Sequence, residues 1–195
     1  MNKPTWKRLG KKYVSARSIV DIKKEWSKYL YTDDEGILDL SSVLPQLIDF
    51  SDLPNEVSNI IETPNILTNA NLDRELLAKK AIASKTNTKF LLDNGNKSWS
   101  SVDAYHSAFL YGKAILAQMG LFQISVSGHN FIVDVFPNYG THSYKRMFDE
   151  KYSELKFPIR ILTINGQRVE HRHIWELLNR VFNICLLYTS DAADE

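Results

Sequence analysis

The feature that most constrains the fold is a pair of long helical patterns separated by one short polar turn. Residues 71–93 repeat leucine at helical spacing and are rich in alanine, which favours helix. Residues 102–119 keep the same spacing of apolar side chains, with small residues such as Ala108 and Gly112 that permit close helix packing. Asn94-Gly95-Asn96 between them is typical of a C-cap and turn. We therefore expect a mainly α fold, an antiparallel helical bundle whose centre pairs 71–93 with 99–119.

Shorter patterns flank this pair. Helices are expected at residues 15–31, 144–155 and 173–184, and as short pieces within 37–63 interrupted by Pro45 and Pro54. Residues 121–140 fit either two short strands around Ser127-Gly128 or a short helix from His129 to Phe136. One small β-hairpin is expected where FPIRILTI is followed by Asn165-Gly166 and QRV, because Asn-Gly is a strong hairpin signal.

The bulk properties are those of an ordinary globular chain. It has 195 residues, a formal net charge of +1 and one cysteine, Cys185. No apolar run approaches the roughly 18 residues that a membrane-spanning helix requires. The charged N-terminus is not followed by the apolar core of a secretory signal, and one cysteine gives no reason to expect an oxidising compartment. The sequence thus predicts a cytoplasmic protein that does not enter a membrane.

The C-terminal residues 185–195, CLLYTSDAADE, resemble one translated reading frame of a transposase-type sequencing adapter. The alternative is a natural acidic tail. On the adapter interpretation the native sequence is truncated near Ile184, and the remaining chain carries 24 basic and 20 acidic residues, a net charge of +4. We expect three parts: residues 1–70 as a basic N-terminal segment with a helical extension, 71–184 as a helical domain, and 185–195 as a non-native tail.

The central helical pair carries a family resemblance. Its residues read AKKAIASKTNTKFLLDNGNKSWSSVDAYHSAFLYGKAILAQMGL and are followed by SGHNFIVDVF. This succession of an Ala/Leu-rich helix, an Asn/Gly turn, a helix ending in a KAIL-like stretch and a His-initiated segment resembles the HEPN superfamily of prokaryotic helical domains. The resemblance covers residues 72–140, and more weakly 165–184.

The resemblance implies RNA as a substrate or ligand. Many members of that family are metal-independent ribonucleases of toxin–antitoxin or phage-defence systems, with an Arg followed four to six residues later by His, built across a homodimer. Arg168 and His173 fit this spacing. Histidine can move the proton of a ribose 2′-hydroxyl, and arginine can stabilise the charge that develops on phosphorus. The expected catalytic residues are therefore Arg168 and His173.

Other basic residues are candidates for binding nucleic acid. Lys7, Arg8, Lys11 and Lys12 are interleaved with aromatic residues, as in segments that hold a phosphate backbone, and Arg172 lies beside the catalytic candidates. The alternatives are a solvated, frayed terminus and a polar cap on the helix that begins near residue 173. His106 fits a packed or partly exposed structural role. No histidine pair has zinc-ligand helical spacing, so no metal and no cofactor are expected.

Two functions remain open at this point. The first is an HEPN-like RNA-binding or RNA-cleaving protein of a toxin or defence system. The second is a non-catalytic helical protein-interaction module with a protein partner, for which an exposed apolar face on the 102–119 helix would be the signature.

Overall fold

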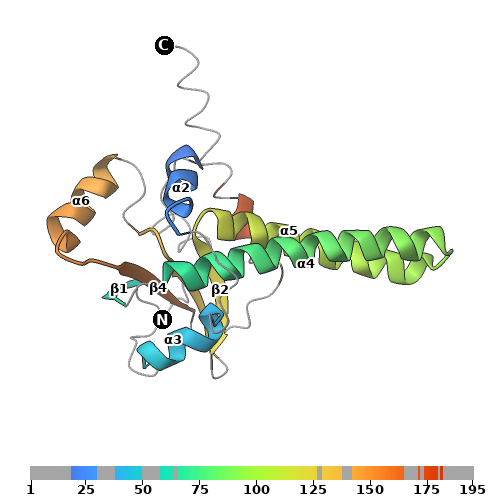
Figure 1. Cartoon of the computed structure of the whole chain (residues 1–195), viewed down its shortest axis with the longest axis horizontal. Coiled ribbons are helices and arrows are strands. Elements are labelled where there is room, and N and C mark those ends of the chain that lie inside the picture. The colour runs from blue at the N-terminus through green and yellow to red at the C-terminus, as the bar shows by residue number, and fades with distance from the viewer. Residues whose placement is uncertain are drawn as a thin grey trace, which may run out of the picture.

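A computed structural model describes residues 19–29, 38–49, 58–63, 66–126, 129–137, 142–164, 171, 174–179 and 181 (Figure 1). Helices make up 65% of these residues, which confirms the mainly helical prediction. The elements in chain order are α2 (Ile19–Trp26), α3 (Leu40–Leu47), β1 (Ser58–Glu62), α4 (Leu67–Asp93), α5 (Lys97–Gln118), β2 (Leu121–Val126), β3 (His129–Asp134), α6 (His142–Tyr152) and β4 (Pro158–Ile164).

The strands form one four-stranded antiparallel sheet in the order β1-β4-β3-β2. β2 and β3 are consecutive and pair from Leu121 opposite Asp134 to Val126 opposite His129. β4 follows α6 and lies between β3 and β1. The sheet is larger than the single small hairpin expected from the sequence, and that part of the fold prediction is wrong.

The strands were missed for two different reasons. Residues 131–137, which include most of β3, are all buried, so this apolar run lacks the alternation that separates a strand from a buried helix. Of the two interpretations left open for 121–140, two strands is correct and the short helix is wrong. β1 lies in a region expected to be helical. It reaches the sheet by pairing with β4, from Ser58 opposite Leu162 to Glu62 opposite Pro158. Local sequence pattern cannot reveal a contact over such a separation along the chain.

The neighbours of β4 also differ from the expected hairpin. β4 pairs with β1 on one side and with β3 on the other. Residues 165–169, which contain the expected turn and its second strand, lie outside the described residues.

The central helical pair is confirmed as an antiparallel hairpin of α4 and α5, which projects away from the sheet (Figure 1). α4 begins at Leu67, four residues before the expected start, and Gly95 in the connecting turn has a positive φ of 75°. The Asn96 side chain caps α5 by accepting a hydrogen bond from the Trp99 amide at 3.4 Å.

A polar clamp joins the two helices in the outer part of the hairpin. Its acceptor is the Asp103 carboxylate on α5, and its donors are Ser84, Asn87 and Thr88 on α4, at 3.1, 3.1 and 2.9 Å. The loss of water around Asp103 favours a higher pKa, but these hydrogen bonds outweigh it and hold the pKa below the ordinary value. The outer hairpin is thus joined partly by polar bonds.

The base of the hairpin is packed against the sheet around Trp26. The Trp26 indole donates to the Gln118 carbonyl at 2.9 Å, and its ring meets Phe122 and Phe136 edge to face. Gly120 connects α5 to β2 with a φ of 77°, and a Cβ there would lie 2.6 Å from the Phe136 ring. Glycine is required at this position for both its backbone and its lack of a side chain.

Residues of the expected C-terminal helix pack on α5. Residues 171, 174–179 and 181 are helical, and the expected helix was 173–184. Ile174, Leu177 and Val181 are buried in the core. The Trp175 ring packs closely on Gly112: a Cβ added to this glycine would lie 3.3 Å from the ring. The small residues of α5 permit this close approach.

Candidate functional site

The predicted site residues fall outside the described part of the chain. This holds for the catalytic candidates Arg168 and His173 and for the binding candidates Lys7, Arg8, Lys11, Lys12 and Arg172. The Arg168–His173 pair therefore stays a prediction. His171, which lies between Arg168 and His173 in sequence, is among the described residues.

His171 packs against α5. We define the cluster of rings formed there as Tyr105, His106, Phe109 and His171. The Tyr105 hydroxyl and the His171 Nδ1 are 2.8 Å apart, and the His171 ring stacks on Phe109 with centroids 4.0 Å apart. His106 is exposed, and its ring centroid lies 6.3 Å from that of His171. The sequence predicted a structural role for His106, and it did not indicate that His106 and His171 lie together.

The cluster has groups that can exchange protons with a substrate. Because the Tyr105 hydroxyl occupies Nδ1 of His171, only Nε2 of that ring remains for another partner. The sequence signal for the cluster was Tyr105 and Phe109 one turn apart on one helix, with His106 directly after Tyr105.

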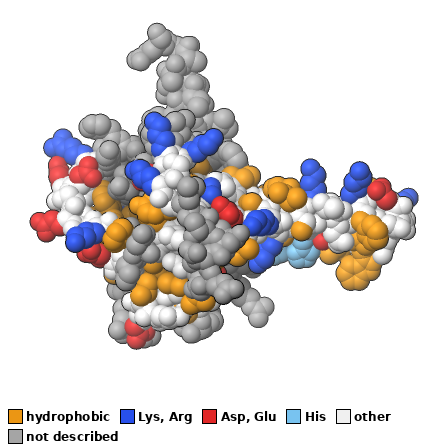
Figure 2. Space-filling view, in the orientation of Figure 1, with side chains coloured by type: hydrophobic (Ala, Val, Ile, Leu, Met, Phe, Trp, Pro, Cys, Tyr) orange, Lys and Arg blue, Asp and Glu red, His pale blue; other side chains and the backbone are white. Residues whose placement is uncertain are grey.

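The outer hairpin, defined here as residues 79–106, has an unusual surface. Five lysines point to solvent there against two aspartates, Asp93 and Asp103; the lysines are Lys79, Lys80, Lys85, Lys89 and Lys97. Of ten exposed large hydrophobic side chains in the described part of the chain, six lie here: Ile82, Phe90, Leu92, Trp99, Val102 and Tyr105. Figure 2 shows blue and orange side chains together along this projection.

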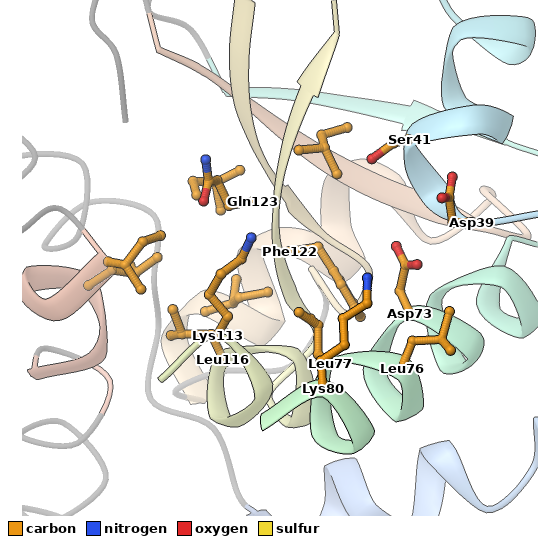
Figure 3. A pocket seen from close by; sticks show the side chains of 15 residues that line it. Asp39, Ser41, Asp73, Leu76, Leu77, Lys80, Lys113, Leu116, Phe122 and Gln123 are labelled. Carbon is orange, nitrogen blue, oxygen red and sulfur yellow. The ribbon is translucent and has the colours of Figure 1, made fainter. Parts of the chain in front are cut away.

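A pocket of about 180 Å³ lies where α3, α4, α5 and β2 meet, at the base of the hairpin (Figure 3). Its polar lining consists of Asp39, Ser41, Asp73, Lys80, Lys113 and Gln123. Asp39, Ser41 and Lys80 are exposed at its mouth, whereas Asp73 and Lys113 are partly buried. Its floor is fully apolar and includes Leu116, Phe122, Ile124, Ile132, Ile174 and Leu177.

Burial alters two charged groups of this pocket. It raises the pKa of Asp73 to about 6, although the Leu40 amide donates to this carboxylate at 3.2 Å. It lowers the pKa of the Lys113 ammonium, and nearby Asp73 opposes that shift only in part. A carboxyl with a raised pKa and a lysine with a lowered one in one cavity mark a candidate binding or catalytic site.

The sequence analysis missed this pocket, although a signal was present. Asp73 and Lys80 are seven residues apart with Leu76 and Leu77 between them, so all four lie on one face of α4. Charged residues on the apolar side of a buried helix face are uncommon and point to a partner or a ligand.

Across the residues that the structure describes, no group of three or more His, Cys, Asp or Glu side chains is arranged to hold a metal ion. In the same residues, no helix is long and apolar enough to cross a membrane.

Comparisons with protein-family models, with curated proteins and with solved structures found no match to this chain.

Proposed function

We propose that this chain is an RNA-binding protein and that the outer hairpin is its surface for single-stranded RNA. The observation that supports this is the combination of five exposed lysines with the two most exposed large hydrophobic side chains of the described residues, both aromatic: Trp99 at 64% and Phe90 at 62%. Proteins that bind single strands use cations to follow the phosphates and aromatic rings to stack on the bases.

Charge favours RNA over a second copy of the chain on this surface. Two copies that met through their outer hairpins would bring five lysines against five lysines, which is unfavourable. A polyanion gains from the same lysines by releasing its bound counterions. The polar clamp does not occupy the exposed aromatic rings, because Asp103 accepts its hydrogen bonds from residues of α4 that are not aromatic.

Metal-independent RNA cleavage belongs to the same proposal. His171, from the C-terminal helix, lies beside Tyr105, which belongs to the outer hairpin. Arg168 and His173 are three and two residues from His171 in sequence. A bound strand would thus lie close to the segment that carries the predicted pair. Cleavage that is unchanged in His173→Ala would contradict this assignment without affecting the proposed RNA binding.

Binding is tested with a fluorescently labelled uridine oligomer by anisotropy over a series of salt concentrations. We expect Trp99→Ala and Phe90→Ala each to cost about 1–3 kcal/mol of binding free energy. Lys85→Met and Lys89→Met should each lower the slope of log K against log salt by about 0.7. Leu92→Ala is the matched control, because Leu92 is 54% exposed but cannot stack on a base.

A second candidate is the non-catalytic protein-interaction module, and a specific observation favours it. Ile82, Leu92 and Val102 are aliphatic and exposed on the hairpin, and aliphatic side chains suit an apolar helix of a protein partner with acidic flanks. The RNA experiment separates the two candidates. An absence of RNA binding, or equal losses for Leu92→Ala and Trp99→Ala, contradicts the RNA proposal.

A further inference from the structure

We infer that the pocket at the base of the hairpin binds a small zwitterion with an apolar side chain, of the class of the aliphatic α-amino acids. Of the residues that line this site, only Lys80 also belongs to the outer hairpin, and the site does not depend on RNA binding. It is lined by residues at the start of α3 and from α4, α5, β2 and β3, with residues of the C-terminal helix at its floor.

The size of the pocket favours a small ligand. Its volume is about 180 Å³. Pockets for nucleotides and drug-sized molecules are larger, at roughly 300–1,000 Å³. The occupant is therefore a small molecule, and it reaches the floor past the exposed Asp39, Ser41 and Lys80 at the mouth.

The positive side of the pocket needs an anion. Within the described residues, neither the Lys80 nor the Lys113 ammonium has a hydrogen bond or an ion pair; Lys113 has the Phe109 ring at 5.9 Å. Figure 3 shows the Lys113 ammonium beside the Gln123 amide on one side of the pocket. Both groups can donate to a carboxylate, and a partly buried ammonium is stabilised by such a partner.

The negative side of the pocket suits an ammonium. Figure 3 shows the Asp73 and Asp39 carboxylates together on the other side, with the Lys80 ammonium next to Asp73. Asp39 accepts from the Ser42 amide as the cap of α3, at 2.8 Å, and Asp73 accepts from the Leu40 amide, at 3.2 Å. Each carboxylate keeps acceptor positions for a ligand N–H. Burial raises the pKa of Asp73, and the charges of Lys80 and Lys113 oppose that shift only in part.

The two charged sides and the apolar floor together select the ligand class. The lining carries two cations and two carboxyls, so a simple anion would face Asp39 and Asp73 and a simple cation would face Lys80 and Lys113. A zwitterion satisfies both sides, and its aliphatic side chain covers the floor at Phe122. An uncharged apolar molecule would leave the Lys113 ammonium without a partner.

The test compares three probes that share one branched apolar body. L-leucine carries both charges, 4-methylpentanoate only the negative one and 3-methylbutylamine only the positive one. Titration calorimetry on the full chain should show leucine binding at least ten times more tightly than either singly charged probe. Equal or tighter binding of 4-methylpentanoate would overturn the zwitterion assignment, and no heat from any probe at millimolar concentration would overturn the site.

Variants locate the binding in this pocket. Lys113→Met keeps most of the side-chain volume and should weaken leucine at least tenfold. Asp73→Asn keeps the shape and should weaken leucine but not 4-methylpentanoate. Lys85→Met on the outer hairpin is the matched control and should leave leucine binding unchanged. Leucine binding that survives both pocket variants, in protein that unfolds with one cooperative transition, would place the ligand elsewhere and contradict the inference.

RNA binding provides the second readout. The pocket variant Lys113→Met should leave uridine-oligomer binding unchanged, whereas Trp99→Ala should leave leucine binding unchanged. Failure of the RNA proposal therefore does not affect this inference, and failure of leucine binding does not affect the RNA proposal.

Discussion

Large apolar side chains are buried in the sheet but exposed on the outer hairpin. Phe131 on β3 is 1% exposed, whereas Phe90 near the end of α4 is 62% exposed. Even charged side chains are buried in the sheet, where Asp134 lies opposite Arg160 in the β3–β4 register. Apolar surface in the sheet stabilises the fold, whereas apolar surface on the outer hairpin is left for contacts with other molecules.

The phenylalanine pair gives the largest expected contrast. Phe131→Ala should lower the free energy of unfolding by about 3–5 kcal/mol, because it leaves a cavity in the core. Phe90→Ala should leave the free energy of unfolding nearly unchanged. Urea denaturation of both variants measures this. A large loss in Phe90→Ala would show that the outer hairpin is part of the packed core.

A glycine pair sharpens the same comparison. Gly120 and Gly95 have φ values of 77° and 75°, so alanine at either position costs about 1–2 kcal/mol in backbone strain. A Cβ at Gly120 would also lie 2.6 Å from the Phe136 ring, whereas nothing lies within 4 Å at Gly95.

We therefore expect Gly120→Ala to lower the free energy of unfolding by about 1–3 kcal/mol more than Gly95→Ala does, because a core ring has to move. Thermal unfolding of the two variants tests this. Equal losses would mean that Phe136 moves away from the new side chain at little cost.

The contributions of two aspartates to the free energy of unfolding should change with pH in opposite directions. Burial raises the folded pKa of Asp73 from 3.8 to about 6, so its contribution to stability is complete below pH 3.8 and is lost as the pH rises toward 6. Asp73→Asn removes this titration. Relative to the parent chain, the variant should gain about 2 kcal/mol in unfolding free energy between pH 4 and pH 7.

Asp103 in the polar clamp is the control with the reverse sign. Its folded pKa lies below the ordinary value, so its contribution is present above that value and is lost as the pH falls. Asp103→Asn should therefore lose stability relative to the parent at neutral pH and recover it in acid. Urea denaturation at several pH values measures both variants, and slopes of the same sign would contradict the assigned causes.

The helical part of the fold could be predicted because its signals are local. The spacing of Leu72, Leu76 and Leu77 and the turn at Gly95 are each contained within a few residues, and α4 and α5 follow them. The sheet could not be predicted in the same way, because β1 finds its partner in β4, far along the chain.

The candidate sites also divide into one with a local sequence signal and one that depends on tertiary packing. The spacing of Arg168 and His173 was visible in one segment, but those residues lie outside the described ones. The pocket was not predicted, because Asp73 and Lys113 come from two helices and meet only after these have packed on β2. The Asp73–Lys80 spacing indicated the α4 side of the pocket alone.

The polar clamp has a consequence for how the hairpin opens. Water can replace the hydrogen bonds of Asp103 to Ser84, Asn87 and Thr88 one at a time, with little net change in free energy. At the base of the hairpin, by contrast, separating the helices would expose the buried rings of Trp26 and Phe122. The two helices should therefore fray from the turn inward and stop at the sheet, which lets the free end adapt its shape to a bound molecule while the remainder keeps its form.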